Sequence, residues 1–272
     1  MKSLQIGRPL ALQRALALAE GSAQGTGSFL AADVHAWLAS PEQGVTAATE
    51  LVRGADATAD ALARLAPSTL TVVATVSSDC ACWAEITRRS EAEPETCIVG
   101  LTYYASAAVS RLVWLRAPLV PGLEVDERPD APDARPVLEQ YFGDLMNSRF
   151  REAAGHFAVD TLYSHPPYVG GAERVLFRGR EALWHGFVTE RGESPVRQVV
   201  TGLWQRHDRV FVEGVIEGIS DGGTFVATAQ ISSAGEIARY VAFYSARRIP
   251  GARRPTPAPR SGRRPLDRPT VP

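Results

Sequence analysis

The stretch "VVATVSSDCACWAEI" (72–86) has a counterpart later in the chain, "VVTGLWQRHDRVFVEGV" (199–215). Each stretch consists of two β-rich runs around a polar turn, and Glu85 of the first aligns with Glu213 of the second. The offset is about 128 residues, which is the length of a whole domain. The sequence therefore predicts two copies of one structural unit.

Two further pairs of segments keep nearly the same offset. "FLAADVHAW" (29–37) aligns with "HFAVDTLYS" (156–164), which places Asp33 on Asp160. "VSRLVWLRAPLVPG" (109–122) aligns with "IARYVAFYSARRIPG" (237–251), which places Arg111 on Arg239. The offset changes by a residue or two, as hairpin loops of unequal length would cause. The repeat therefore extends over most of the chain.

Each copy opens with a helical stretch and closes with four β-rich runs. In the second copy these runs cover 197–207, 209–219, 224–232 and 236–246, and glycine-bearing turns, "SDGG" and "SSAG", separate the later ones. Between them and the opening helix, "GREALWHGFVTER" (179–191) has helical apolar spacing. The pattern predicts an α+β unit with helices packed on one face of a curved antiparallel sheet of four to six strands.

The repeat and the local composition together suggest the domain limits. We expect one domain at 8–120, a proline- and acid-rich linker at 121–135 and a second domain at 136–249. The segment 250–272 is rich in proline and arginine and has no apolar periodicity, which predicts a disordered tail.

Composition excludes several classes of function. The chain has 272 residues, 45% hydrophobic and 22% charged, with a formal net charge of −1, so we expect a cytoplasmic globular protein without a nucleic-acid or membrane surface. The segment "PLALQRALALAEG" (9–21) has a glutamine and an arginine among leucines at helical spacing, which favours an amphipathic helix over a signal peptide. No stretch is apolar enough to span a bilayer.

The three cysteines favour no disulfide framework. Cys80 and Cys82 lie in one β-rich run and Cys97 in the next, and an odd number in a reducing compartment suggests small buried side chains. A metal site is the alternative, but no fourth ligand lies nearby in the sequence. The chain also lacks a glycine-rich phosphate loop and a nucleophile elbow, so we expect chemistry without a metal or cofactor.

A helix ending in "F-A-x-D", then a short strand, "R-G-R-E-A-L" and a four-stranded meander resembles the nuclear transport factor 2-like superfamily, in its SnoaL-like polyketide cyclase and ketosteroid isomerase branch. The resemblance covers 136–249 well and 8–120 more loosely. It implies two cone-shaped domains, each with a cavity between helices and sheet. Members of this superfamily commonly pair through their sheets, so the two domains should form an intramolecular pseudo-dimer, and we expect a monomer in solution.

The resemblance also implies roles for residues of the second copy. Tyr141, nineteen residues before Asp160, falls on the oxyanion-binding tyrosine of ketosteroid isomerases, and His165, followed by a proline, falls on the base. The acid of the third strand falls at about Ala227, which has no proton to donate, so this sequence departs from the steroid isomerase pattern. A fused pair is also similar to two-domain polyether epoxide hydrolases, which rely on an acidic pair in each domain.

In the first copy the equivalent positions carry no base. Arg14 takes the place of the helical tyrosine, Leu38 takes the place of the base, and the third strand reads Cys97, Val99, Leu101 and Tyr103. We interpret the first domain as a degenerate partner of the second.

Strand alternation and helix position select the residues that should line the second cavity. Trp184 and His185 lie on the helix expected to roof it, and Tyr163 lies in the stretch "YSHPPYVGG" (163–171). The set is mostly apolar with a few hydroxyls, which suits a hydrophobic, oxygenated small molecule. The predicted binding residues are Tyr163, Trp184, His185, Phe225, Ala227, Ala229, Tyr240 and Tyr244.

Two interpretations of Glu213 and two functions stay open at this point. Glu213 is either a second acid or the ion-pair partner of Arg239 across its sheet, and the retention of Glu85 and Arg111 favours the ion pair. One function is a cofactor-independent enzyme that uses His165 as base and Tyr141 as hydroxyl donor in cyclisation, isomerisation, dehydration or epoxide opening on a polyketide or terpenoid. The other is a non-catalytic module of the same fold that binds a small molecule or a protein partner.

Overall fold

A computed structural model of the chain describes residues 10–20, 29–39, 49–65, 69–89, 94–103, 108–120, 128–168, 174–218 and 223–245. The first half begins with the expected amphipathic helix and continues with strands around one further helix. Its elements are α1 (Leu10–Ala19), β1 (Leu30–Ala39), β2 (Thr49–Arg53), α2 (Ala55–Ala63), β3 (Thr69–Ser77), β4 (Ala81–Arg89), β5 (Glu95–Tyr103) and β6 (Val109–Pro118).

The second half repeats this order with a longer helical start and a π-helical turn after α5. Its elements are α3 (Arg135–Met146), α4 (Phe150–Gly155), β7 (Phe157–His165), β8 (Val175–Arg178), α5 (Arg180–Gly186), the π-helical turn η2 (Phe187–Arg191), β9 (Arg197–Arg206), β10 (Arg209–Glu217), β11 (Gly223–Ile231) and β12 (Ile237–Ser245).

The two sheets have the same strand order. It is β2-β1-β6-β5-β4-β3 in the first half and β8-β7-β12-β11-β10-β9 in the second, which confirms two tandem α+β units. The sheets are mixed rather than antiparallel, because β1 pairs with β6 and β7 with β12 in parallel. Alternation in the sequence gives the faces of a strand but not its direction. In the second half α5 carries the chain across the sheet, and the meander then returns to the first strand from the far edge.

Each half has a glycine at the equivalent position, between the short edge strand and the helix that follows it. Gly54 precedes α2 with φ of 90°, and Gly179 precedes α5 with φ of 87°. The amide of Gly54 donates to Val34 O at 2.9 Å, and that of Gly179 donates to Thr161 O at 2.7 Å. Because glycine adopts positive φ at little cost, this residue lets the chain turn from strand to helix at the same place in each copy.

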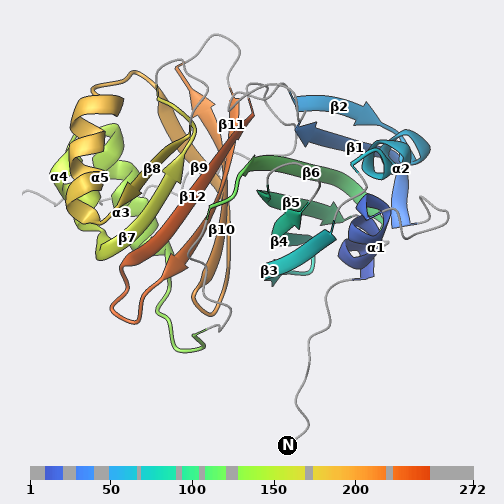
Figure 1. The fold of residues 1–272 in the computed structure, drawn as a ribbon, viewed down its shortest axis with the longest axis horizontal. Helices are drawn as coiled ribbons and strands as arrows, with labels where there is room; N and C mark the ends of the chain where they lie inside the picture. The colour runs from blue at the N-terminus through green and yellow to red at the C-terminus, as the bar shows by residue number, and fades with distance from the viewer. Residues whose placement is uncertain are drawn as a thin grey trace, which may run out of the picture.

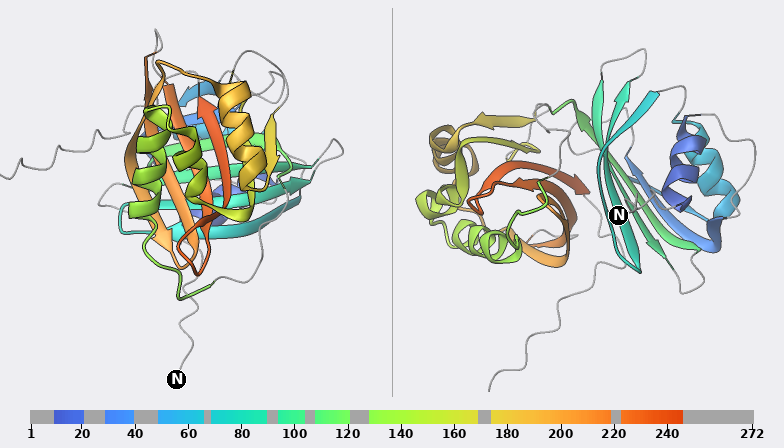
Figure 2. Two further views of the ribbon diagram at one scale, coloured as in Figure 1. Left: turned by 90° about the vertical axis from the view of Figure 1, so that its left-hand side faces the viewer. Right: turned by 90° about the horizontal axis from the view of Figure 1, so that it is seen from below.

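The sheets pack back to back and the helices lie on the outer faces (Figures 1 and 2). Each half has its own apolar core between helices and sheet, and a third apolar cluster lies between the two sheets. Trp83 of β4 packs on Trp204 of β9, with ring centroids 5.3 Å apart. The arrangement is the expected intramolecular pairing of two domains.

Two buried ion pairs cross the interface between the sheets. Arg239 donates to both carboxylate oxygens of Glu85, at 3.0 and 2.7 Å, and Thr228 donates to the same carboxylate at 2.9 Å. In the reciprocal pair, Arg111 donates to both oxygens of Glu213. Each arginine therefore binds the glutamate of the other half, as a pseudo-twofold arrangement requires.

The expected pairing of Glu213 with Arg239 within one sheet is wrong. Glu213 lies opposite Val226, and Val226 lies opposite Phe243 of β12. Arg239 is four residues from Phe243, or about 13 Å along the strand, and two strand spacings add about 10 Å across the sheet. The side chains cannot meet there, so the facing sheet supplies the partner of each.

Other predictions have mixed outcomes. Cys82 and Cys97 are buried as expected, whereas Cys80 is exposed. The segment "FAVD" begins β7 instead of ending a helix, since α4 ends at Gly155. Among the described helices none is long and apolar enough to cross a membrane. Residues 121–127 of the predicted linker and the whole predicted tail lie outside the described residues, and the domain limits stay predictions.

Candidate functional site

A cavity of about 320 Å³ opens at one end of the concave, helix-covered face of the second sheet. It lies where β7 and β12 end and β9 begins, between helix α3 and the turn η2. None of the described residues that line it is an aspartate or a glutamate. The lining residues are Leu145, His165, Pro167, Tyr168, Arg191, Ser194, Val196, Gln198, Ile216 and Tyr244.

His165 faces this cavity, as the sequence predicts, and is enclosed by aromatic rings. It is the last residue of β7 and only 4% exposed. The Tyr168 ring stacks on it with centroids 4.4 Å apart, and the Tyr244 ring meets it edge-on at 4.8 Å. The imidazole is thus fixed in position before any ligand binds.

Hydrogen bonds define the tautomer of His165. Its Nδ1 is hydrogen-bonded to the carbonyl oxygen of Pro166. Because a carbonyl oxygen can only accept, Nδ1 carries the proton. Its Nε2 lies 2.6 Å from the Tyr244 hydroxyl and, in the neutral ring, accepts that proton. The Gln198 amide donates to the same tyrosine oxygen. The result is a polar row, Gln198–Tyr244–His165, along the cavity wall.

The burial of these groups shifts their proton affinities. Burial lowers the pKa of His165 from 6.5 to about 3, against the hydrogen bond to Pro166, and the charges of Arg174 and Arg191 lower it further. Burial also raises the pKa of Tyr244 well above its ordinary value, although Arg191 and the Gln198 amide partly offset this. At neutral pH both groups are therefore uncharged, and the Nε2 lone pair of the imidazole accepts a hydrogen bond from the Tyr244 hydroxyl.

Tyr141 does not hold the position expected for it. Its side chain is 1% exposed and does not line the cavity, and its hydroxyl lies 3.4 Å from that of Tyr163. The Tyr168 hydroxyl donates to the same Tyr163 oxygen at 2.9 Å. The hydroxyl that bonds to the His165 ring is that of Tyr244. Strand β12 runs parallel to β7 with Tyr240 opposite Tyr163, so the ends of the two strands bring Tyr244 and His165 together.

Most of the predicted binding residues on β11 and β12 face the predicted side of the sheet but fill the core. The Phe142 ring of α3 packs on Phe225 at 5.6 Å and on Tyr240 at 6.5 Å. The helix thereby covers this part of the sheet, and the cavity is left only beyond the end of the helix. The residues so covered are Phe225, Ala227, Ala229 and Tyr240, and Tyr163 is buried with them.

The two residues expected to roof the cavity point elsewhere. His185 is exposed and lies 3.5 Å from Glu181, one helical turn earlier. Trp184 is half-buried, and its ring lies under the guanidinium of Arg151 at 4.9 Å. The expectation for both was wrong because α5 is short, and the following turn η2 supplies the roof through Arg191 instead.

Sequence reasoning missed several cavity residues. Arg191 reads as an ordinary basic residue at a helix end, and Gln198 as the polar member of a strand. Tyr168 belongs to the "YSHPPYVGG" stretch, and a tyrosine three residues after the candidate base is the signal that could have found it. The remaining residues that were missed, such as Ser194, Val196 and Ile216, lie in a loop or near a strand end, and only the packing decides where these segments lie.

The first half has an apolar interior at the equivalent place, as expected. Leu38 is 4% exposed, and Cys97, Val99 and Leu101 belong to the buried core. Arg14 is exposed on α1 and does not point into that core. Burial raises the pKa of the Cys97 thiol to about 12, so this cysteine stays protonated.

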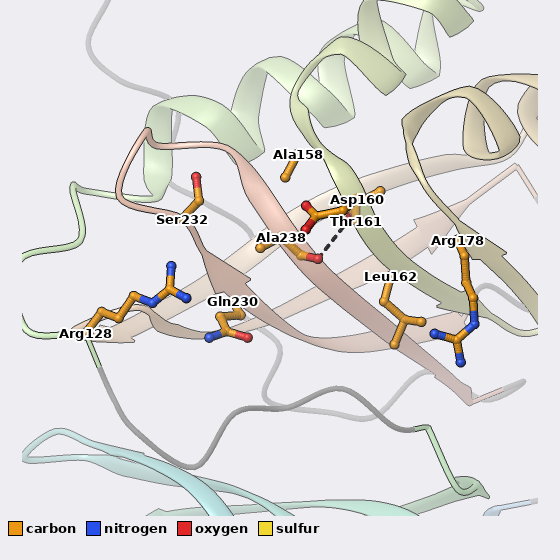
Figure 3. A pocket seen from close by; sticks show the side chains of 9 residues that line it. All are labelled: Arg128, Ala158, Asp160, Thr161, Leu162, Arg178, Gln230, Ser232 and Ala238. Carbon is orange, nitrogen blue, oxygen red and sulfur yellow. Dashed lines mark hydrogen bonds between the residues drawn. The ribbon is translucent and has the colours of Figure 1, made fainter.

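A second hollow, of about 290 Å³, lies on the other face of the second sheet, beside the interface between the halves (Figure 3). Arg128 and Arg178 lie at its two sides with Asp160 between them (Figure 3). The Thr161 hydroxyl is bonded to the carbonyl groups of Ile237 and Ala238. Asp160 is exposed and lies away from the first cavity, so it marks the repeat and not the candidate site.

The described residues contain no group of three or more histidine, cysteine, aspartate or glutamate side chains arranged to hold a metal ion.

No protein-family model and no curated protein matches the chain. Among solved structures, a protein from Kribbella flavida assigned as a ketosteroid isomerase is 20% identical, with a TM-score of 0.36, over 45% of this chain and 84% of its own. An NTF-2 like protein from Burkholderia xenovorans is 16% identical, with a TM-score of 0.34, over 43% and 88%.

A third similar structure is SalBIII, an epoxide hydrolase/cyclase-like enzyme of pyran ring formation in the polyether salinomycin. It is 16% identical, with a TM-score of 0.35, over 42% of this chain and 91% of its own. These three structures are of a ketosteroid isomerase-like, an NTF2-like and an epoxide hydrolase/cyclase-like protein, and the likeness concerns the fold.

Proposed function

We propose that the cavity of the second half takes a hydrophobic, oxygenated small molecule, such as a polyketide or terpenoid, and moves a proton on it. The observation that carries the proposal is the row Gln198–Tyr244–His165, which brings a hydroxyl and an imidazole lone pair to the wall of a largely apolar cavity. Tyr244 takes the place first expected for Tyr141. Isomerisation, cyclisation, dehydration and epoxide opening all need a proton acceptor and a hydroxyl of this kind.

In the simplest cycle the proton moves through Tyr244. A substrate C–H proton passes to the Tyr244 oxygen while the tyrosine proton passes to His165 Nε2, which leaves an enolate and an imidazolium. The reverse transfers return a proton to another carbon and restore the neutral ring. The Gln198 amide stabilises the tyrosine oxygen during both transfers.

The low pKa of His165 limits the substrates that this cycle can serve. An imidazole of pKa about 3 accepts a proton only from an acidic C–H, or when a negative charge develops beside it. Ketones with an activated α-carbon and β-keto esters meet this requirement. Simple alcohols and alkanes do not.

The same pKa favours a second candidate function. A neutral, fully hydrogen-bonded row is also a lining that recognises a ligand without changing it, because it has little driving force to take a proton. The alternative is therefore a binding module of the same fold, for a small molecule or a protein partner, in which His165 and Tyr244 only orient what they bind.

Deuterium incorporation separates the two functions. The full chain is incubated in D₂O with 2-tetralone and with a hydrophobic β-keto ester, and α-exchange is followed by NMR. We expect the wild type to exceed buffer catalysis, and Tyr244→Phe and His165→Gln to lose about 100-fold or more of the rate. Arg178→Gln, outside the cavity, should exchange at the wild-type rate. A probe that binds without faster exchange would rule out the enzyme and support the binding module.

A further inference from the structure

The charge of the cavity points to a more specific class of ligand. At neutral pH the lining carries one ionised side chain among the described residues, the guanidinium of Arg191, since burial keeps His165 neutral and the tyrosines protonated. No described carboxylate offsets this charge inside the cavity. A molecule bound there is thus exposed to a net positive charge in a mostly apolar surrounding.

Arg191 has donors that the protein does not use. Its NH1 donates to the carbonyl of Gly192 at 3.1 Å, and its guanidinium lies over the Phe150 ring at 5.8 Å. A guanidinium has five N–H donors, and the bond to Gly192 is the one hydrogen bond that this side chain makes with the described residues. The contact with the Phe150 ring uses the face of the guanidinium and none of its N–H donors, which leaves donors for a bidentate partner.

The local backbone holds Arg191 over the cavity. It ends the π-helical turn Phe187–Arg191, in which the chain departs from the regular helix directly after α5. Such turns are rare and occur frequently at functional sites. Gly192 follows with φ of 61°, so the chain turns away immediately and leaves the arginine at the edge of the cavity.

We propose that the ligand of this cavity is a hydrophobic carboxylate, whose anionic group binds the guanidinium of Arg191 and whose apolar body lies against Leu145, Val196 and Ile216. The inference rests on the proposed function in that the same cavity takes the ligand. The carboxylate then fixes the rest of the molecule against Tyr244, and the arginine charge favours any enolate that forms nearby.

Matched neutral and anionic probes test the proposal on the full chain. 2-Naphthylacetic acid and 2-naphthylacetamide share their shape, and isothermal titration calorimetry gives their dissociation constants. We expect the acid to bind about 10-fold or more tightly than the amide, as a charge-assisted hydrogen bond in a partly buried site predicts. Arg191→Gln should abolish this preference, and Arg191→Lys should keep part of it, because lysine has the charge but not the fork.

The control is Arg178→Gln, an exposed arginine of the second hollow, which should keep the full preference. Equal binding of the two probes, a preference that survives in Arg191→Gln, or no binding of either at millimolar concentration would overturn the proposal. His165→Gln separates it from the proposed function, since this variant should lose α-exchange and keep the preference for the acid. A preference without any exchange in the wild type would leave the carboxylate site standing and reject the enzyme.

Discussion

His165 lies on the wall of the cavity and is a weak base in the free protein. Its Nδ1–H donates to Pro166 O and its Nε2 accepts from Tyr244, so both nitrogen atoms are paired in the neutral ring. A second proton on Nε2 would break the bond from Tyr244 and place a charge in a buried position. Burial therefore keeps the ring neutral, even though the hydrogen bond to Pro166 favours the protonated form.

This coupling predicts a pH-dependent stability. The pKa of His165 is about 3 in the folded protein and near 6.5 in the unfolded chain, so between these values the unfolded chain binds the extra proton. Stability is complete above about pH 6.5 and falls as the pH drops toward 3, by up to about 1.4 kcal/mol per unit from this residue. Urea unfolding at several pH values gives the free energy of unfolding as a function of pH, and this free energy should fall less steeply with decreasing pH in His165→Gln than in the wild type. An equally steep fall in His165→Gln would contradict the low pKa. The control is His185→Gln, at an exposed position, which should keep the wild-type dependence.

The strands of the second sheet depend on glycines at positions of close approach. β10 and β9 shift register between Glu213 and Gly214, where the sheet bends. A Cβ on Gly214 would come within 2.2 Å of the Phe225 ring and 2.5 Å of Val199 O. Since the second contact is with backbone, a rotamer change cannot relieve it. The bulge at this position thus requires a residue without a side chain.

Gly214→Ala should destabilise the protein by about 1–3 kcal/mol, since overpacking forces the two strands apart. The matched control is Gly143→Ala in α3, where the added methyl meets nothing within 4 Å. That substitution should stabilise the protein by about 0.5–1 kcal/mol, because alanine favours the helix. Thermal unfolding of both variants measures the difference, and similar melting temperatures would show that the bulge tolerates a side chain.

At the scale of the whole molecule, the two halves are joined by apolar contacts and by the reciprocal ion pairs. Glu85 and Arg239 are 2% and 1% exposed, and Arg239 donates to both carboxylate oxygens of Glu85 across the interface. A buried charge without its partner is costly, whereas two apolar residues in the same place are not. The pairs therefore fix how the halves face one another.

Glu213→Gln should destabilise the protein by about 3–5 kcal/mol, because Arg111 then remains buried with its charge unmatched. The double variant Glu213→Leu with Arg111→Met should recover most of this loss. Glu139→Gln, at an exposed pair with Arg135, should change stability by less than about 1 kcal/mol. Chemical denaturation gives all three values. If the double variant is as unstable as Glu213→Gln, the loss does not come from the unmatched charge of Arg111, and this explanation is wrong.

The same interface predicts the oligomeric state. The backs of both sheets cover each other, so this apolar surface is not available to pair with a second chain. We expect a monomer of about 29 kDa in light scattering coupled to size-exclusion chromatography. A dimer at micromolar concentration would mean that another surface associates.

The repeated pattern of the chain determined the α+β class, the tandem units and the equivalence of Glu85 with Glu213 and of Arg111 with Arg239, whereas the intramolecular pairing was expected from the family resemblance. Periodicity and internal repeats are local properties, so one chain is enough to reveal them. The sequence also identified His165 and Tyr244 as residues of the cavity.

The tertiary structure alone decided which groups meet. The parallel alignment of β7 and β12 joins Tyr244 to His165 and leaves Tyr141 in the core. Helix α3 covers the middle of the sheet, so that the cavity remains at its end with Arg191 at the edge. The facing of the two sheets gives each buried arginine a glutamate from the other half. Partner choice depends on strand direction, depth and packing between distant segments, and no local pattern in the sequence encodes these.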